Sequence, residues 1–600
     1  MRRFVLALSA AALVSVPAFA QPRIDAVAAG DPTGTSAVLW ARAAEAGKPV
    51  TVRLEIATDP GFATIVHRAA QPTVPEDDFT VKIPVDGLRS GTRYHYRFCA
   101  VVCDPADTGR FNTAPAPDQK VRLRFGFTGD ADGRYRPYPA AANIGDRDLD
   151  FFILLGDAMY EVAAKGSPAT IRLTANATQA EAEQGLADFL RKYRENSLGV
   201  TSDGATALTG QQGLRPMRQA TGHYTMLDNH ELGSADLQAG GAPPGSRGFN
   251  LDPALDTNET GPFNNQTMAF RVMEKAVYAY HPTRIAIAGT PATGLRVTGP
   301  IVDQPSDPRM HGTPRNWFAQ PWGAHAVYIQ TDGRTYRDAR LGAPSVTPWP
   351  NEETGPRADN PKRTMLGRTQ MAWLKATLLA EQRAGRTWKF VGISSPIDQV
   401  GSGEPVLNTR WPAPGTQNQD GKSWFGGYRA ERNELLGFIA ENAITNVVFL
   451  TTDDHFVRVT TLQYQTPAGT MAPVPGTFQI VSGPIGAGGP DFFPGHDQAA
   501  VARGLGLRQA KLAAMNQPST GLPADFPGLT VTHRRFGPQG GPPQPMDFFI
   551  PDQFAYSTLE VDPSGVLTVE TFGIDAYKTN IFPDTPIQAE RVMSFRIVPR

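Results

Sequence analysis

The length, composition and charge of the chain exclude several classes of protein. At 600 residues and 64.7 kDa, the chain is too long for one small core and predicts several domains or one large α/β domain with appendages. With 57 basic and 58 acidic side chains, its formal net charge of -1 provides no positive field for stable nucleic-acid binding. Two cysteines are too few for a cysteine-built zinc site, so any metal must be bound mainly by oxygen and imidazole.

The first 20 residues have the layout of an export signal. Arg2 and Arg3 precede a short apolar run that contains Pro17 and ends in Ala18-Phe19-Ala20. A short run with this cleavage site is typical of a signal peptide and not of a permanent membrane span. The arginine pair leaves both twin-arginine and Sec-type export open. We therefore expect residues 1–20 to be removed and an exported protein, periplasmic or extracellular, with no membrane span to remain.

Residues 21–116 are predicted to form an all-β sandwich. Short segments typical of strands, separated by turn residues, occur at 37–40, 52–56, 79–83 and 94–98. The stretch Gly87–Phe98 resembles the corner of a fibronectin type III domain, in which a leucine lies under a turn and alternating tyrosines face inward. Trp40 and Tyr96 are therefore expected in the core.

Two features lie near the end of this first domain. Cys99 and Cys103 are separated by three residues, and in an oxidising compartment they can link a strand end to its turn, although two free thiols at a sheet edge are the alternative. The segment 113–119 has the proline and small polar content of a linker. We place the domain boundary there, with the second domain covering residues 117–600.

The second domain alternates buried strands with helices. Continuous apolar runs predict strands at 121–127, 149–155, 224–227, 327–331, 388–393 and 446–450. Apolar residues at helical spacing predict helices at 180–196, 368–383 and 429–442. This alternation is typical of an α/β fold in which helices cover both sides of the sheet. In the C-terminal extension, 486–494 and 547–556 are candidates for a lid.

Polar side chains follow four of these predicted strands. The four groups are Asp130 with Asp132, Asp157 with Tyr160 and Glu161, Asp228 to Glu231, and Asp453 to His455. Because the carboxyl ends of strands in an α/β sheet form the crevice that binds ligands, these side chains are expected to converge. Converging carboxylates repel one another unless cations lie between them. Carboxylate oxygens and imidazole on several strand ends are what a pair of metal ions requires.

Several of these segments resemble a known family. Gly156-Asp157-x-x-Tyr160 and Asn229-His230-Glu231 are similar to two blocks of the calcineurin-like metallophosphoesterases. The order of blocks over residues 24–485 resembles the alkaline phosphatase D (PhoD-like) branch of that group. The resemblance implies a four-layer α/β/β/α metallophosphatase domain preceded by the fibronectin type III-like sandwich.

The resemblance also implies roles for individual residues. Asp157 is expected to be the carboxylate that bridges two ions, Tyr160 a phenolate ligand of a ferric or similarly acidic ion, and Asn229 a ligand of the second ion. His230 is expected to orient phosphate or to donate a proton to the leaving oxygen, as suits a group that titrates near neutrality.

The remaining expected ligands include two departures from the family pattern. Asp453 and His455 are placed as metal ligands after the last strand. Asp130 is a further ligand, but it occupies a position where the family usually has a cysteine, and Thr452 one where it usually has a glycine. Since a carboxylate is a harder ligand than a thiolate, manganese and zinc are alternatives to the iron and calcium expected from the family. Asp228 and Asn229 likewise stand where the family usually has two acids, so Asn229 is a third departure.

The predicted function is an exported phosphoesterase, expected to be a monomer, that hydrolyses small phosphomonoesters, phosphodiesters or both with a metal-activated water. One alternative is a purple acid phosphatase-like enzyme, although such an enzyme should show Gly-His-x-His where this chain has Thr452-Asp453-Asp454-His455. A second is a catalytically silent binding protein that keeps the fold and has lost its metals. Metal analysis and turnover of an aryl phosphate distinguish a metal-dependent enzyme from a silent binding protein.

Overall fold

The computed structural model describes most of the chain between residues 22 and 600. The described residues are 22–45, 47–164, 170–198, 213–233, 237–246, 252–341, 357–397, 425–488, 522–534, 549–550, 553–576 and 587–600. The predicted signal peptide lies outside them. Over these ranges, none of the helices has the length and apolar character needed to cross a membrane.

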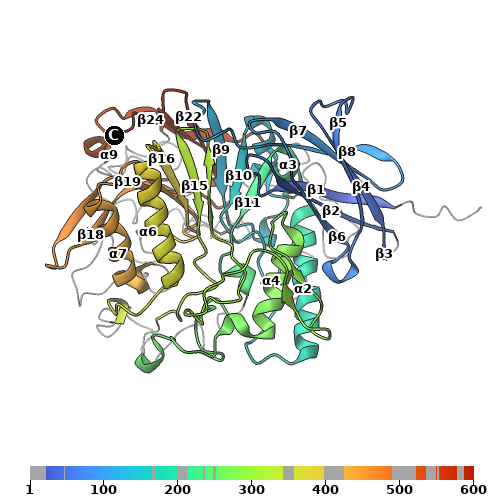
Figure 1. Cartoon of the computed structure of the whole chain (residues 1–600), viewed down its shortest axis with the longest axis horizontal. Helices are drawn as coiled ribbons and strands as arrows, with labels where there is room; N and C mark the ends of the chain where they lie inside the picture. Colours follow the sequence, from blue (N-terminus) through green and yellow to red (C-terminus); the bar gives the residue numbers. More distant parts are fainter. Residues whose placement is uncertain are drawn as a thin grey trace, which may run out of the picture.

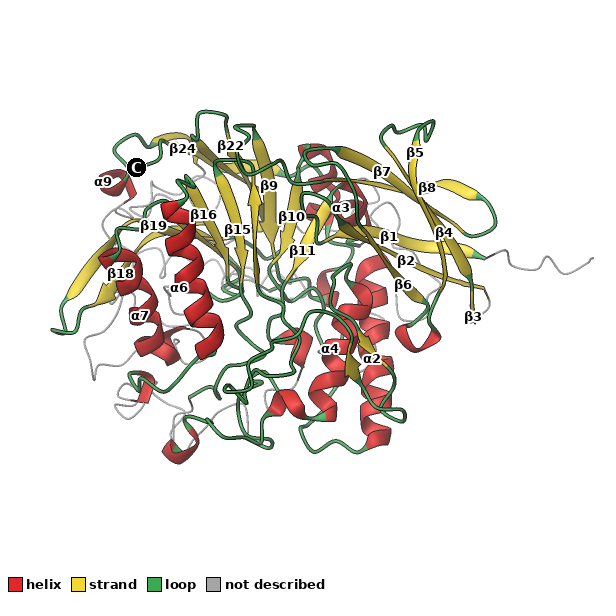
Figure 2. Cartoon of the chain, in the orientation of Figure 1, coloured by secondary structure: helices red, strands yellow, loops and turns green. Residues whose placement is uncertain are grey.

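Two large β-sheets form the centre of the molecule (Figures 1 and 2). The first consists of β20 (Thr530–Arg534), β24 (Glu590–Ile597), β23 (Leu567–Asp575), β22 (Gln553–Val561), β9 (Leu123–Thr128), β10 (Phe151–Leu154), β11 (Gly222–Thr225), β1 (Arg23–Gly30), β2 (Ala37–Glu45) and β3 (Lys48–Pro49), with β6 (Thr80–Val85) also paired to β2. The second consists of β14 (Phe318–Trp322), β15 (Ala326–Gln330), β16 (Trp388–Gly392), β17 (Val447–Thr451), β19 (Met471–Val481), β18 (Val457–Gln465) and β21 (Phe549–Ile550).

Aromatic side chains fill the space between the two sheets. Phe125 of β9 stacks on Phe151 of β10 at 4.8 Å between ring centroids and meets Phe390 of β16, in the opposite sheet, at 4.9 Å. Val448 and Phe478 belong to the same buried cluster. Because these strands carry apolar residues on both faces, their sequences are continuous apolar runs.

Helices cover the outer faces of both sheets. They are α1 (Pro139–Ala142), α2 (Gln179–Leu198), α3 (Arg215–Ala220), α4 (Met268–Tyr280), α6 (Arg368–Arg383), α7 (Arg429–Glu441) and the short α9 (Leu522–Asp525). Helices α6 and α7 pack on the second sheet, whereas α1 and α3 pack on the first and α2 pairs with α4 beside it. The predicted four-layer α/β/β/α arrangement is therefore confirmed, and so are the three predicted helices.

The N-terminal residues form the predicted sandwich. The sheet β5 (Ile65–Pro72), β4 (Thr51–Ala57), β7 (Arg93–Cys99) and β8 (Cys103–Asn112) packs against β1, β2 and β6, with Tyr96 buried between the two layers. Cys99 and Cys103 form the predicted disulfide. Trp40 is buried as expected but lies outside the sandwich core, since its indole N–H donates to the Ala279 carbonyl of α4 at 2.7 Å.

The sandwich and the central sheet are continuous. Strand β1 runs parallel to β11, with Gly30 opposite His223, and the N–H of Asp31 donates to the His223 carbonyl at 3.1 Å. Figure 2 shows the N-terminal strands extending from the edge of the central sheet. The predicted linker at 113–119 therefore joins two parts that share one sheet.

The C-terminal residues complete this sheet. Strand β22 pairs antiparallel with β9, placing Leu559 opposite Phe125, and β23, β24 and β20 extend the sheet outward. The prediction of a lid is wrong for Gln553–Tyr556, because these residues belong to β22 and cover an otherwise unpaired edge of β9. Residues 489–494, also predicted as part of the lid, lie outside the described residues.

Candidate metal centre

The ends of four strands from both sheets meet at one place. Strands β9, β10 and β11 are parallel neighbours in the first sheet, and β17 runs parallel to β16 and β19 in the second. The turns that follow them carry Asp130, Asp157, Asp228 and Asp453, respectively. The structure thus brings together the four polar groups that the sequence places after buried strands.

The backbone turns sharply at these acids. Asp130, Asp157 and Asp453 have φ of 66°, 52° and 70°, and His455 has φ of 56°. Residues with a Cβ adopt this left-handed conformation uncommonly, and it occurs preferentially at functional sites. The strained turns reverse the chain directly after the strands, so that the side chains face one common space.

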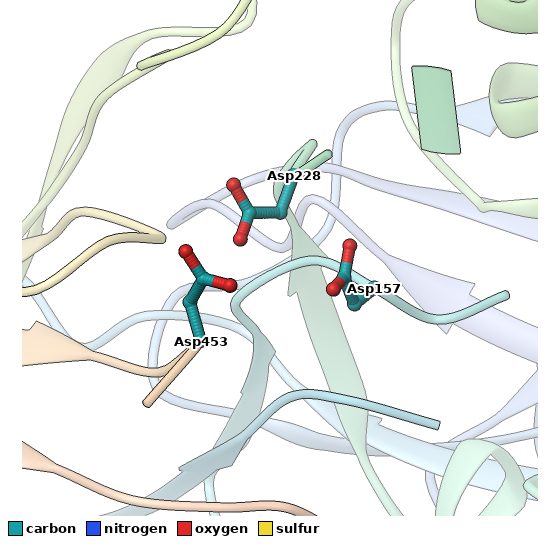
Figure 3. Close-up of side chains that lie close together, drawn as sticks. All are labelled: Asp157, Asp228 and Asp453. Carbon is teal, nitrogen blue, oxygen red and sulfur yellow. The ribbon is translucent and has the colours of Figure 1, made fainter. Parts of the chain in front are cut away.

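Three carboxylates form the centre of the site. Asp157, Asp228 and Asp453 each present an oxygen within 4.8 Å of the other two, and Figure 3 shows their carboxylates facing one another. The Oδ2 atoms of Asp157 and Asp228 are buried and accept no hydrogen bond from the described residues. Burial raises the pKa of Asp157 well above its usual range, and so do the charges of Asp228, Glu231 and Asp130. Buried carboxylate oxygens without donors are suited to binding a cation.

A second donor group adjoins these carboxylates. The Tyr160 hydroxyl lies 3.1 Å from Nε2 of His455, which lies 3.6 Å from Oδ1 of Asp130. Oδ1 of Asp130 is also buried and accepts no hydrogen bond within the described part of the chain. For ligands at about 2.1 Å from one ion, neighbouring donors are separated by about 3.0 to 3.4 Å. The two distances from Nε2 of His455, 3.1 Å and 3.6 Å, are close to those between neighbouring ligands on one ion.

The protonation of His455 responds to these neighbours. Burial lowers the pKa of the imidazole, but the nearby charge of Asp130 and the hydrogen bond to the Gly488 carbonyl outweigh this effect, giving a pKa of about 9. The Nδ1 atom lies 2.6 Å from the Gly488 carbonyl, which holds the ring so that Nε2 faces Tyr160 and Asp130. This orientation by a carbonyl is common among metal-binding histidines.

Asn229 and Arg334 complete the other side of the carboxylate cluster. The buried guanidinium of Arg334 donates to Oδ1 of Asp228, to Oδ1 of Asn229 at 3.3 Å and to Oδ2 of Asp453 at 3.4 Å. Arg334 thus neutralises part of the negative charge. An arginine after a strand is more often a salt-bridged surface residue, so the sequence alone does not single out Arg334. Asp228, to which the family resemblance gave no role, is one of the three central acids.

Glu231 holds two of the turns in register. Its carboxylate accepts the backbone N–H groups of Asp157 at 2.7 Å, Ala158 at 2.6 Å and Asp228 at 2.8 Å. Burial raises its pKa to about 7, although the N–H donors oppose this increase. The last residue of the Asn-His-Glu block is therefore structural, and it fixes the positions of Asp157 and Asp228.

His230 lies beside the donor groups and not within them. Its Nδ1 is 2.5 Å from Oε2 of Glu161, and its backbone N–H donates to Oδ1 of Asp157 at 2.9 Å. Its ring stacks on Tyr160 with centroids 3.7 Å apart. About a fifth of the side chain, 21%, is exposed, so the ring is accessible from outside the carboxylate cluster. In the sequence, Glu161 belongs to the same group as Asp157 and Tyr160, but only its contact with His230 reveals its role.

The chain is similar in sequence to known proteins over most of its length. Residues 126–521 match the model of the PhoD-like phosphatase family, and residues 10–115 match that of the PhoD-like phosphatase N-terminal domain. The chain is 26% identical over 447 residues to alkaline phosphatase D of Bacillus subtilis (strain 168), and this match covers 72% of the chain and 64% of that relative's length.

The fold resembles solved structures to different degrees. A structure of PhoD superposes with a TM-score of 0.58 and 19% identity, covering 95% of this chain and 91% of the other. The purple acid phosphatase PPD1 of yellow lupin (Lupinus luteus) gives a TM-score of 0.43 at 10% identity, covering 96% and 74%. The first likeness supports the fold, and the family match extends over more than half of the sequence, including all of the strand-end residues described above. The chain therefore belongs to the PhoD-like phosphatase family.

Proposed function

We propose that the protein is an exported, metal-dependent hydrolase of phosphoric esters. The observation that carries this proposal is the set of buried carboxylate oxygens on Asp130, Asp157 and Asp228 that accept no hydrogen bond from the described residues. These oxygens lie near the place where strands of both sheets end. The chain also belongs to a phosphatase family. Small phosphomonoesters, phosphodiesters or both are the proposed substrates, and the protein is proposed to act as a monomer without binding nucleic acid.

The donor groups fit two or more metal ions. Asp130, Tyr160 and His455 are the proposed ligands of one ion, whereas Asn229 and Asp453 are proposed for the second. Asp157 is proposed to bridge both, and Asp228 adds a further carboxylate beside Asp453. Iron and calcium are expected from the family, and the oxygen-rich donor set is also suited to manganese or zinc. When bound, such ions lower the pKa of a water molecule and offset charge on the phosphoryl oxygens.

The protein's own residues supply proton transfer and orientation. In the proposed arrangement His230 donates Nδ1–H to Glu161, which fixes the ring and leaves Nε2 to deliver a proton to the leaving oxygen. Stacking on Tyr160 restricts the ring further. Arg334 holds Asp228, Asn229 and Asp453 in place through its hydrogen bonds and charge.

The proposal includes the organisation of the chain. Residues 1–20 are proposed to be a cleaved signal peptide, 21–116 the fibronectin type III-like N-terminal domain, and 117–600 the metallophosphatase domain with its C-terminal extension. The disulfide between Cys99 and Cys103 supports the proposed oxidising compartment.

Metal removal tests the proposed activity. Turnover of an aryl phosphomonoester and of a bis-aryl phosphodiester is measured before chelation, after chelation and after iron, calcium, manganese or zinc is returned. We expect chelation to abolish turnover and at least one ion to restore it, with circular dichroism unchanged. Activity that persists after complete metal removal contradicts the proposal, and so does a metal-loaded protein that hydrolyses neither ester.

A further inference from the structure

Asp130 and Thr452, two of the departures from the family pattern, contact each other. The Thr452 hydroxyl donates a hydrogen bond to Oδ2 of Asp130, and the backbone N–H of Asp453 approaches the same oxygen at 3.4 Å. Both side chains are fully buried. Oδ1, in contrast, accepts no hydrogen bond from the described residues. The two oxygens of the Asp130 carboxylate therefore have different surroundings.

Close packing fixes this pair in one orientation. A Cβ added at Gly483 would lie 2.8 Å from both Oδ2 of Asp130 and Oγ1 of Thr452. A Cβ added at Gly129 would lie 2.7 Å from Cγ2 of Thr452. Only glycine fits at these two positions, so their backbone packs directly on the pair. In such a densely packed interior neither side chain can turn without displacing its neighbours.

The orientation of the pair determines where Oδ1 points. With Oδ2 held by Thr452, Oδ1 lies 3.6 Å from Nε2 of His455, which is 3.1 Å from the Tyr160 hydroxyl. We propose that Thr452 is a positioning residue for a metal ion, because its hydroxyl restricts Asp130 to binding the ion through Oδ1 alone. This inference rests on the proposed function, which assigns an ion to Asp130, Tyr160 and His455.

The physical basis is the cost of leaving Oδ2 without its donor. Without the hydroxyl, the long contact with the Asp453 N–H is all that the described residues offer Oδ2, and a buried carboxylate oxygen that loses a hydrogen bond is destabilised. Recovering a partner for Oδ2 then requires the carboxylate and its packed neighbours to shift together, which moves Oδ1 from its position beside His455. Removing a group that orients a metal ligand typically weakens metal binding by about 10- to 100-fold.

Thr451 provides a matched control for the experiment. It directly precedes Thr452 and is also fully buried, but its hydroxyl has no hydrogen-bond partner among the described residues. Thr452→Val, Thr452→Ser and Thr451→Val are purified, their iron, calcium, manganese and zinc contents are measured, and their metal loss to excess EDTA is followed. We expect Thr452→Val to retain metal about 10- to 100-fold more weakly. Thr452→Ser and Thr451→Val should resemble the unchanged protein.

The outcomes separate this inference from the proposed function. Equal metal retention by Thr452→Val and Thr451→Val, in a protein that binds metal and hydrolyses esters, overturns the inference alone. Selective metal loss from Thr452→Val, in a metal-binding protein that hydrolyses no ester, supports the inference and contradicts the proposed function. A protein that binds none of the four metals overturns both. If Thr452→Val does not fold, Thr452→Ala takes its place, because it removes the hydroxyl without adding a methyl group.

Discussion

Glu161 and Asp157 hold His230 from two directions, through its ring nitrogen and its backbone N–H respectively. Neither the carboxylate cluster nor the group of Asp130, Tyr160 and His455 includes an atom of the His230 side chain. The contacts of His230 are therefore those expected of a proton donor beside a metal centre, as opposed to a metal ligand.

Substituting His230 tests this role. We expect His230→Ala to keep most of its metal and to lose about 100- to 10,000-fold in turnover, the usual range for a positioned general acid. The loss should be smaller for an aryl phosphate than for an alkyl phosphate, because a good leaving group needs less protonation. Turnover and metal content are measured on both esters. Equal losses on the two esters would show that His230 positions phosphate and does not deliver a proton.

Sequence alone predicted which strand ends converge but not every contact made there. Acids after apolar runs placed Asp130, Asp157 and Asp453 near one another, because parallel strands end at a common edge. The ion pair between Arg334 and Asp228 was not predictable in the same way. It joins the turns that follow β11 and β15, which belong to different sheets, and the buried position of Arg334 depends on how those sheets pack.

Among the secondary-structure elements, α4 and the C-terminal strands were the main omissions. In α4, 11 residues of 13 are buried, among them Glu274 and Lys275, so its apolar spacing was readable in the sequence but the burial of its polar residues was not. Strand β22 is likewise buried along most of its length and follows a segment close to low complexity. Both segments are buried by contacts with residues that lie far away in the sequence.

The C-terminal strands should contribute strongly to stability. Leu559 of β22 is fully buried opposite Phe125, so Leu559→Ala should lower the free energy of unfolding by about 2 to 5 kcal/mol. Val598, which is 51% exposed, serves as the control, and Val598→Ala should change it by less than about 0.5 kcal/mol. Urea denaturation measures both. A Leu559→Ala protein as stable as the control would mean that β22 is not part of the folded core.

The disulfide between β7 and β8 should stabilise the sandwich without affecting turnover. It closes a loop of only five residues, for which restriction of the unfolded chain accounts for about 2 kcal/mol. Replacing Cys99 and Cys103 together by alanine should lower the free energy of unfolding by about that amount and leave kcat unchanged. Denaturation and ester turnover are compared in the two proteins. A large fall in turnover of the folded variant would contradict the separation of the disulfide from the metal centre.

The predicted domain division gives the order of the two parts along the chain, but the two parts are not physically independent. The β1–β11 pairing continues one sheet through both parts, and Trp40 of the sandwich packs against Tyr280 of α4, with ring centroids 5.8 Å apart. The sequence could not reveal this contact. A tryptophan alternating with small residues predicts a buried strand but does not identify its partner.

We expect the N-terminal sandwich and the metal-binding part to unfold together. Differential scanning calorimetry of the whole chain should show one transition, and Trp40→Ala should lower its midpoint by about 3 °C, from the typical cost of removing a buried aromatic side chain. Val66→Ala, at a site 47% exposed on β5, is the control and should leave the midpoint unchanged. Two separate transitions would show that the shared sheet does not couple the parts.

Elemental analysis of Asp157→Asn, together with ester turnover, tests the claim that the buried carboxylates bind the metal ions needed for hydrolysis. Asp157 is fully buried, and its Oδ2 accepts no hydrogen bond from the described residues, so a neutral amide should fail to balance two cations. Asp31→Asn is the matched control, because Asp31 is also buried with left-handed φ, 46°, but accepts the backbone N–H of Arg284 and is not one of the three clustered acids. We predict that Asp157→Asn folds but loses metal and activity, while Asp31→Asn keeps both. A metal-loaded, fully active Asp157→Asn protein would contradict the claim.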